Sequence, residues 1–253
     1  MGIPTSSAES PHILGHRGTS EKFTENGIMA FRYCLENGIT GFETDFRLTA
    51  DGVVVVLHDP DLKRTTDSEG VIENMTLDEV KKARLKNSDE SVPTADELLA
   101  LFDDRRDFYI ELEMKAYYSE YTPERMDDFL DKLYACAKKH LGGGNYMFTT
   151  FSDQVLARMK ERHPDAKTGR ICGGLTNAIV DKALELGCYC VAATLDGTEQ
   201  AVVDRAKAAG LKINLWHSET LELWKQARDM GADVSTNNHP VAVLQAIRAD
   251  QGK

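Results

Sequence analysis

The sequence predicts a (β/α)8 barrel, the TIM-barrel fold of the α/β class, with a small insertion after the hairpin that follows the second strand. Short apolar runs typical of buried strands alternate eight times with amphipathic runs typical of helices, along 253 residues. That number of units in a chain of this length is characteristic of the barrel. We expect one domain over residues 1–253, with a polar, turn-rich insertion at about residues 59–93.

The predicted strands are short runs that end in turn-forming or polar residues. In chain order they are residues 12–15, 41–46, 108–115, 146–151, 166–171, 189–195, 212–216 and 232–236. The run at residues 53–58 is the returning arm of a hairpin and lies outside this series. An open, doubly wound sheet is the alternative. It loses support because no Gly-x-Gly-x-x-Gly follows a strand, which disfavours dinucleotide binding.

The predicted helices have apolar residues at helical spacing together with start and stop signals. They cover residues 27–37, 94–102, 123–140, 153–162, 177–186, 199–209, 219–230 and 241–249. Thr122 and Ser152 are suitable N-caps, and Pro123 suits a first helical position. Several helices are expected to end at glycine, at Gly38, Gly187, Gly210 and Gly231.

Composition excludes several classes of function. The formal net charge is −11 and no basic run occurs, which argues against nucleic-acid binding and against binding to anionic membranes. No apolar run approaches the ~18 residues of a spanning helix. The five cysteines form no Cys-x-x-Cys pair, which suits reduced thiols in a cytoplasmic protein. We therefore expect a cytoplasmic enzyme without a stable membrane anchor.

The first ten residues lack the basic and apolar regions of a signal peptide. They fit the loose myristoylation pattern Met-Gly-x-x-x-Ser, although a frayed terminus is the simpler interpretation.

The segment at residues 41–58 is the most informative part of the chain. Asp51-Gly52 between two strand-like runs predicts a two-residue type I′ turn. Pairing the two arms around that turn places Asp45 opposite His58, and Glu43 shares the face of Asp45 because strands have a period of two. Two carboxylates and an imidazole are therefore expected to converge, whereas the alternative is a surface strand with solvated acids.

Polar residues recur at the ends of the predicted strands, where TIM barrels place their active sites. They are His16, Arg17, Glu43, Asp45, His58, Glu111, Glu113, Lys115, Trp216 and His217. Carboxylates this close together need a cation or raised pKa values, because two unit charges 4 Å apart repel by about 4 kcal/mol at an effective dielectric constant of 20. All-oxygen ligands favour Mg²⁺, Ca²⁺ or Mn²⁺.

A metal ion, Arg17 and Lys115 together form a group of positive charges that suits a bound phosphate. Two histidines beside a bound phosphate can act as general base and general acid. No motif for an activated serine or cysteine nucleophile is present.

These residues resemble those of the glycerophosphodiester phosphodiesterase family over nearly the whole chain. The shared motifs are His16-Arg17-Gly18, Glu25-Asn26, Glu43-x-Asp45, Thr49-x-Asp51-Gly52, His58-Asp59, Leu62-x-Arg64-Thr65-Thr66, Pro93-Thr94 and Glu113-x-Lys115. The resemblance implies a TIM barrel and one divalent cation. It assigns the roles as follows: Glu43, Asp45 and Glu113 as metal ligands, His16 and His58 as the acid–base pair, Arg17 and Lys115 on the phosphate, and Phe151 and Trp216 in the alcohol pocket.

The chain departs from the family pattern at three places. Thr24 stands where Pro is usual, Glu111 stands where a small polar residue such as Asn is common, and residues 236–240 replace a Thr-Asp-x-Pro motif. The resemblance implies hydrolysis of glycerophosphodiesters to an alcohol and glycerol 3-phosphate. A lysophospholipase D and a catalytically silent barrel used for binding are the alternatives. The head group, the metal and the oligomeric state stay open.

Overall fold

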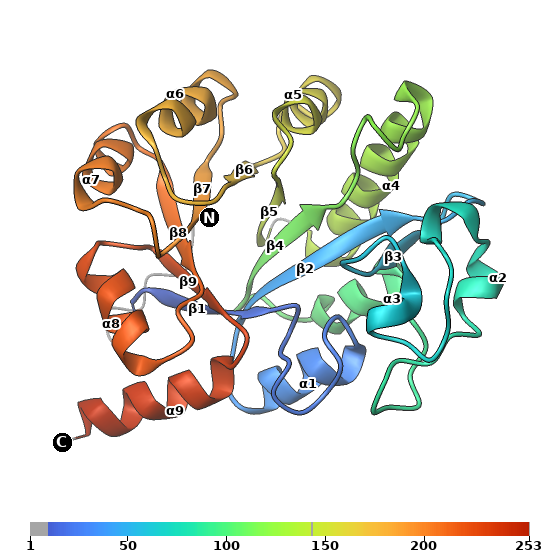
Figure 1. Ribbon diagram of the computed structural model, residues 1–253, viewed down its shortest axis with the longest axis horizontal. Helices are drawn as coiled ribbons and strands as arrows, with labels where there is room; N and C mark the ends of the chain where they lie inside the picture. Colours follow the sequence, from blue (N-terminus) through green and yellow to red (C-terminus); the bar gives the residue numbers. More distant parts are fainter. Residues whose placement is uncertain (1–9, 143, 253) are drawn as a thin grey trace.

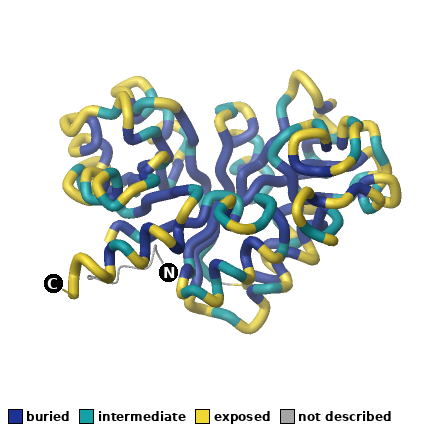
Figure 2. The backbone as a smooth tube through the Cα atoms, turned by 60° about the horizontal axis from the view of Figure 1, so that its bottom comes forward, coloured by how far each residue is buried: buried dark blue, intermediate teal, exposed yellow. Residues whose placement is uncertain are grey.

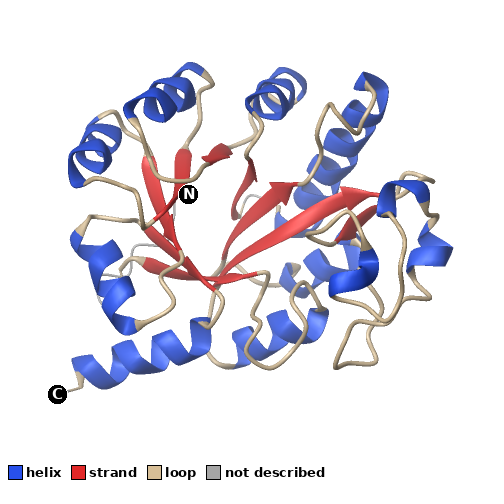
Figure 3. Ribbon diagram, viewed as in Figure 1, coloured by secondary structure: helices blue, strands red, loops and turns tan. Residues whose placement is uncertain are grey.

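Eight parallel strands close into a barrel in the computed structural model, which describes residues 10–142 and 144–252 (Figures 1 and 3). The barrel strands are β1 His12–His16, β2 Gly41–Leu48, β4 Tyr109–Met114, β5 Asn145–Thr150, β6 Thr168–Ile171, β7 Cys190–Thr194, β8 Lys212–Trp216 and β9 Val234–Asn237. The ring closes because β1 pairs with both β9 and β2. The predicted TIM barrel is therefore confirmed, with each predicted barrel strand in place.

Helices surround the barrel (Figure 1). They are α1 Ile28–Glu36, α2 Leu77–Val80, α3 Ala95–Leu99, α4 Pro123–Leu141, α5 Asp153–Arg162, α6 Asn177–Glu185, α7 Gln200–Ala208, α8 Leu221–Asp229 and α9 Pro240–Gln251. The predicted caps of two of them are present. Thr122 and Ser152 each accept a hydrogen bond from a backbone N–H in the first turn of α4 and α5.

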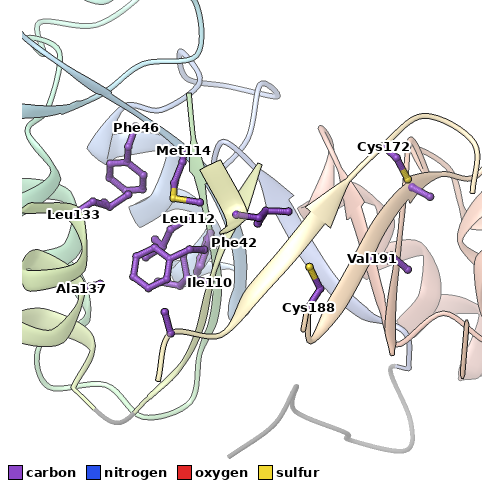
Figure 4. Close-up of a cluster of buried hydrophobic side chains, with 14 of the residues drawn as sticks. Phe42, Phe46, Ile110, Leu112, Met114, Leu133, Ala137, Cys172, Cys188 and Val191 are labelled. Atoms are coloured by element: carbon purple, nitrogen blue, oxygen red, sulfur yellow. The ribbon is translucent and has the colours of Figure 1, made fainter. Parts of the chain in front are cut away.

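The main apolar core lies between the strands and the helices. Phe42 and Phe46 of β2 and Leu112 of β4 belong to a cluster of buried side chains that includes Leu133 of α4 (Figure 4). Strand residues alternate in direction, so the residues between these, including Glu43 and Glu113, face the barrel axis. The buried centre and the exposed outer loops are visible in Figure 2. The sequence of β2 and β4 thus places apolar residues outward and acids inward.

The hairpin differs from its prediction by one residue in register. Strand β3 Val54–Val56 runs antiparallel to β2 and pairs Val56 with Phe46. The N–H of Leu57 donates to the Asp45 carbonyl at 3.1 Å, so Asp45 faces Leu57, and the predicted pairing of Asp45 with His58 is wrong.

The turn itself explains the shift. The Gly52 N–H donates to the Thr49 carbonyl at 3.0 Å, and Gly52 has a φ of +78°, whereas Asp51 does not have a positive φ. This is a three-residue loop, a type I turn followed by a left-handed glycine, in place of the predicted type I′ turn. The Asp51 carboxylate accepts hydrogen bonds from the Thr49 hydroxyl at 2.6 Å and the Leu77 N–H at 3.0 Å, which stabilise the observed turn.

The insertion after β3 has a small apolar core of its own. It contains the short 3-10 helices Leu62–Arg64 and Ile72–Asn74 and the helix α2. Leu62, Ile72 and Val80 are buried against Val55 and Leu57. The insertion therefore packs on the outer arm of the hairpin, next to the end of β2.

Within residues 10–142 and 144–252, no helix combines the length and apolar character needed to cross a membrane. The myristoylation pattern and the proposed absence of a signal peptide concern residues 1–10, of which residues 1–9 lie outside the described part of the chain.

The hairpin turn yields a stability prediction. We expect Gly52→Val to lower the free energy of unfolding by about 1–3 kcal/mol, because a β-branched residue is strained at a φ of +78°. Gly52→Asn should cost less, since Asn adopts the left-handed conformation more readily. Urea denaturation of both variants measures the difference. Equal stability of the Val variant and the natural chain would contradict the left-handed turn.

Candidate active site

Four carboxylates face the interior of the barrel from two adjacent strands. Parallel pairing of β2 with β4 sets Glu43 beside Glu111 and Asp45 beside Glu113, so all four side chains share one face. All four residues are at most 5% exposed. Glu43, Asp45 and Glu113 each offer an oxygen, and these three atoms lie within 4.8 Å of one another.

The oxygens of this carboxylate cluster suit a cation. Glu43 Oε1 is buried and has no hydrogen-bond partner among the described residues. The Lys115 ammonium lies 3.4 Å from Asp45 Oδ1 and 2.7 Å from Glu113 Oε1. Three oxygen donors form a ligand set for Mg²⁺, Ca²⁺ or Mn²⁺. The residues present therefore fit one divalent cation.

Burial and mutual repulsion act on the pKa values of the cluster. Burial, followed by the charges of Asp45 and Glu113, raises the pKa of Glu43 well above its usual range. Burial and the Asp45 charge raise the pKa of Glu113 to about 7, although Lys115 opposes them. Burial would raise the pKa of Asp45 as well, but the charges of Arg17 and Lys115 outweigh it and hold this pKa below its usual range.

Arg17 and Asn26 fix Asp45 from the loop that follows β1. Arg17 Nε lies 3.1 Å from Asp45 Oδ2, and Asn26 Nδ2 donates to the same oxygen at 2.9 Å. Both loop residues have positive φ values, 56° and 62°. The Arg17 N–H also donates to the backbone carbonyl of Glu43 at 2.8 Å. The loop is thus bound to β2 by both side chains and backbone.

His16 ends β1 and points its Nε2 toward the carboxylate cluster, 3.7 Å from Glu43 Oε2. Its Nδ1 lies 2.7 Å from Asn238 Oδ1. The Glu219 carboxylate accepts a hydrogen bond from Asn238 Nδ2 at 2.9 Å. The oxygen of the same Asn238 amide therefore faces the His16 ring. The proton is therefore assigned to Nδ1, and Nε2 stays free to accept. Burial, helped by the Arg17 charge, lowers the pKa of His16 to about 4.

His58 follows β3 and reaches the same cavity despite the shifted hairpin register. Its Nδ1 lies 2.6 Å from Asp59 Oδ1, so a proton on Nδ1 donates to the carboxylate and Nε2 stays free. The His58 carbonyl accepts from Arg47 Nε at 2.9 Å, which holds the backbone where the chain bends away from the strand. Burial is the main cause of its lowered pKa.

A cavity of about 200 Å³ opens above these groups. The predicted site residues that line it are His16, Arg17, Glu43, His58, Glu113, Lys115, Phe151 and Trp216. Asp45 does not line the cavity, because it is fully buried within the carboxylate cluster. On the far wall, Phe151 is 40% exposed, with Lys115 Nζ 5.8 Å from its ring centroid. The Trp216 ring lies 4.4 Å from that of His217.

Several residues that hold the site were missed by sequence reasoning. Asn26 and Arg64 lie within motifs that carried the family resemblance, but no role followed from them. Glu219 and Asn238 are polar residues in loops after β8 and β9, which is a weak signal for a contact with His16 on β1.

Glu111 lies on the cavity floor, apart from the three candidate ligands. Asn214 Nδ2 donates to both of its oxygens at 3.0 Å, and the Tyr109 hydroxyl donates to Oε1 at 3.1 Å. Burial raises the pKa of Glu111 from 4.5 to about 7 although these hydrogen bonds oppose the shift.

A second group with possible metal ligands, Asp96, Cys136 and His140, lies between α3 and α4. Both ring nitrogens of His140 already contact carboxylates, Nδ1 at 2.6 Å from Asp103 and Nε2 at 2.9 Å from Asp96. Because both ring nitrogens of His140 already have carboxylate partners, we do not assign a metal to this group.

Comparison with known proteins identifies the family. Residues 16–242 match the model of the glycerophosphoryl diester phosphodiesterase family. A glycerophosphodiester phosphodiesterase of Caldanaerobacter subterraneus subsp. tengcongensis is 28% identical over 93% of this chain and 97% of its own. A probable glycerophosphodiester phosphodiesterase 1 of Mycobacterium tuberculosis is 25% identical over 92% of this chain and 91% of its own.

Solved structures give the same fold. A phosphodiesterase of Oleispira antarctica, solved with the product sn-glycerol-3-phosphate, has a TM-score of 0.86 at 23% identity, over 94% of this chain and 97% of that one. A glycerophosphodiester phosphodiesterase of Thermotoga maritima has a TM-score of 0.74 at 25% identity, over 94% of this chain and 98% of that one.

Glu111 yields a prediction about pH. Its pKa is higher in the folded chain, about 7, than the ordinary 4.5, so the folded state binds the proton more tightly. The contribution of Glu111 to the free energy of unfolding is therefore complete below pH 4.5. It falls by about 3 kcal/mol as the pH rises to about 7, at 1.36 kcal/mol per pH unit. We expect Glu111→Gln to gain stability relative to the natural chain by about this amount between pH 4.5 and 8.

Urea denaturation in EDTA at several pH values measures this difference, with the exposed Glu222→Gln as the control for loss of one charge. Parallel stability curves for the natural chain and Glu111→Gln would show that Glu111 does not titrate in this way.

Proposed function

This chain belongs to the glycerophosphoryl diester phosphodiesterase family and is a phosphodiesterase, and from that premise we propose that it hydrolyses glycerophosphodiesters to an alcohol and glycerol 3-phosphate with one divalent cation. The convergence of three buried carboxylates beside two histidines carries this proposal. Acids in this arrangement are costly to bury, so the geometry makes physical sense when a cation lies between them.

Glu43, Asp45 and Glu113 would hold the cation at the base of the cavity. A divalent cation there supplies charge that polarises the phosphate and offsets its negative charge. Arg17 and Lys115 line the same cavity and would bind the remaining phosphate oxygens. Both are also bound to Asp45, which keeps them charged and in place.

His16 and His58 would exchange protons with the substrate through their Nε2 atoms. Each ring keeps its Nδ1 proton on a fixed acceptor, Asn238 for His16 and Asp59 for His58. One Nε2 takes the proton of the attacking oxygen, which belongs to water or to the glycerol 2-hydroxyl. The other, protonated beforehand, gives its proton to the oxygen of the leaving alcohol.

Phe151 and Trp216 would contact the alcohol part of the substrate on the opposite wall of the cavity. Their rings present apolar surface to that part of the substrate.

The two alternative functions receive less support. A lysophospholipase D needs an apolar rim for a lipid chain, but among residues 59–93, all of which are described, Val71 is the one exposed large apolar side chain. A catalytically silent barrel used for binding would be expected to lack some of the proposed catalytic residues. Both histidines line the cavity, and the three acids lie together.

The first test is a release assay over glycerophosphocholine, -ethanolamine, -glycerol and -inositol, with and without EDTA. We expect glycerol 3-phosphate from at least one of these substrates, loss of activity in EDTA, and recovery with Mg²⁺, Ca²⁺ or Mn²⁺, because the carboxylate cluster needs a cation. Asp45→Asn should not recover. Full turnover after metal removal, verified by elemental analysis, would refute the metal requirement. Absence of product from all four substrates would refute the proposed activity.

The second test concerns the two histidines. His16→Ala and His58→Ala should each lower kcat by ~10²–10⁴-fold, the usual contribution of a positioned proton-transfer group. KM should change little, because the cation and Arg17 bind the phosphate. His163→Ala is a matched control, since His163 stacks on Tyr134 outside the barrel. A near-normal kcat in either active-site variant would remove that histidine from the mechanism.

A further inference from the structure

Arg64 connects the insertion to the active site through two carboxylates. Its Nε lies 2.5 Å from Asp59 Oδ2 and its Nη2 lies 3.2 Å from Asp59 Oδ1. On its other side, Nη1 and Nη2 donate to Glu25 at 2.9 and 2.7 Å. The guanidinium therefore binds two carboxylates at once, each through two hydrogen bonds, which a lysine ammonium cannot reproduce with the same geometry.

Both carboxylates that Arg64 binds continue into the active site. Asp59 is the partner of His58 Nδ1 at 2.6 Å. Glu25 accepts from Arg17 Nη1 at 2.8 Å, and Arg17 in turn contacts Asp45. A continuous chain of charged contacts thus runs from His58 to Arg17, and its middle member is Arg64.

The backbone around Arg64 is held in place, although the Arg64 side chain is 46% exposed. The neighbouring Leu62 is fully buried in the core of the insertion. The Arg64 carbonyl accepts from Lys86 Nζ at 2.9 Å, and the Thr66 hydroxyl donates to the Leu62 carbonyl at 2.8 Å. The guanidinium therefore reaches both carboxylates from a backbone that is held in place.

The positive charge of Arg64 balances the negative charges of Asp59 and Glu25. Burial would raise the pKa of Asp59, but the hydrogen bonds from Arg64 and His58 outweigh it and lower this pKa to about 2. The pKa of Glu25 is likewise lowered, because hydrogen bonds from Arg64 and the Arg17 charge overcome its burial. Both carboxylates therefore stay ionised and able to accept.

We propose that Arg64 is a positioning residue that keeps His58 Nδ1 protonated against Asp59 and holds Glu25 against Arg17. The insertion thereby sets the orientation of an acid–base group and of a phosphate-binding group together. The catalytic consequence rests on the proposed function, whereas the orientation of the His58 ring does not.

Removing Arg64 should free Asp59 to turn toward solvent and leave the His58 ring without a fixed tautomer. Loss of the outer partner of a metal-bound histidine typically costs ~10–10²-fold in activity, and we take the same range for the partner of an acid–base histidine. We expect Arg64→Ala and Arg64→Lys each to lower kcat by about this factor, because neither side chain binds both carboxylates in two places. Lys63→Ala is the matched control, since Lys63 shares the same short helix but contacts Glu69 on the surface.

Two further measurements separate orientation from a loss of folded protein. Millimolar guanidinium should restore part of the activity of Arg64→Ala, whereas Lys63→Ala should not respond. Nitrogen-15 NMR of the histidine rings, with His58→Ala for assignment, should show His58 protonated on Nδ1 in the natural chain and a mixture of tautomers in Arg64→Ala.

The outcomes distinguish the two proposals. If the natural chain hydrolyses none of the four glycerophosphodiesters, the proposed function fails, and the NMR measurement alone decides the role of Arg64. If the natural chain is active but both Arg64 variants keep its kcat and the His58 tautomer, the proposed role of Arg64 is overturned.

Discussion

The burial of negative charge inside the barrel is the constraint that shapes the rest of the active site. Glu43, Asp45 and Glu113 lie on two adjacent strands and are almost completely removed from solvent. Lys115 and Arg17 supply the nearest positive charges, and they reach the acids from the end of β4 and from the loop after β1. The backbone of that loop is unusual, because Arg17 and Asn26 both have positive φ values, and the side chains of both residues contact Asp45.

The fold could be predicted from the sequence because its signals are local. Apolar and polar residues alternate within β2 and β4, and helix caps such as Thr122 stand next to the segments they cap. The hairpin register could not be predicted in the same way. Asp51 accepts a hydrogen bond from Leu77, which lies 26 residues away in the insertion, and a rule based on the dipeptide alone does not include that contact.

The candidate site likewise has residues that could be predicted from the sequence and residues that could not. His16, Glu43, Asp45 and Glu113 could be predicted because strand ends in a barrel meet at one face. The groups that orient them were missed. Asn238 contacts His16 across 222 residues, and Arg64 contacts Glu25 across 39 residues between two loops. Such contacts depend on how loops fold over the barrel, and neither periodicity nor motif spacing contains that information.

The walls of the cavity come from different parts of the barrel. The candidate metal ligands, His16, His58 and the two basic residues belong to the part of the ring that ends with β4, whereas Phe151, Ile171, Ala192 and Trp216 lie on or just after β5 to β8. Under the proposed function, substitutions at these four positions would alter which alcohol is accepted, while the groups that act on the phosphate and the loops that orient His16 stay the same. The preference for the alcohol would then be free to change in this protein independently of its chemistry.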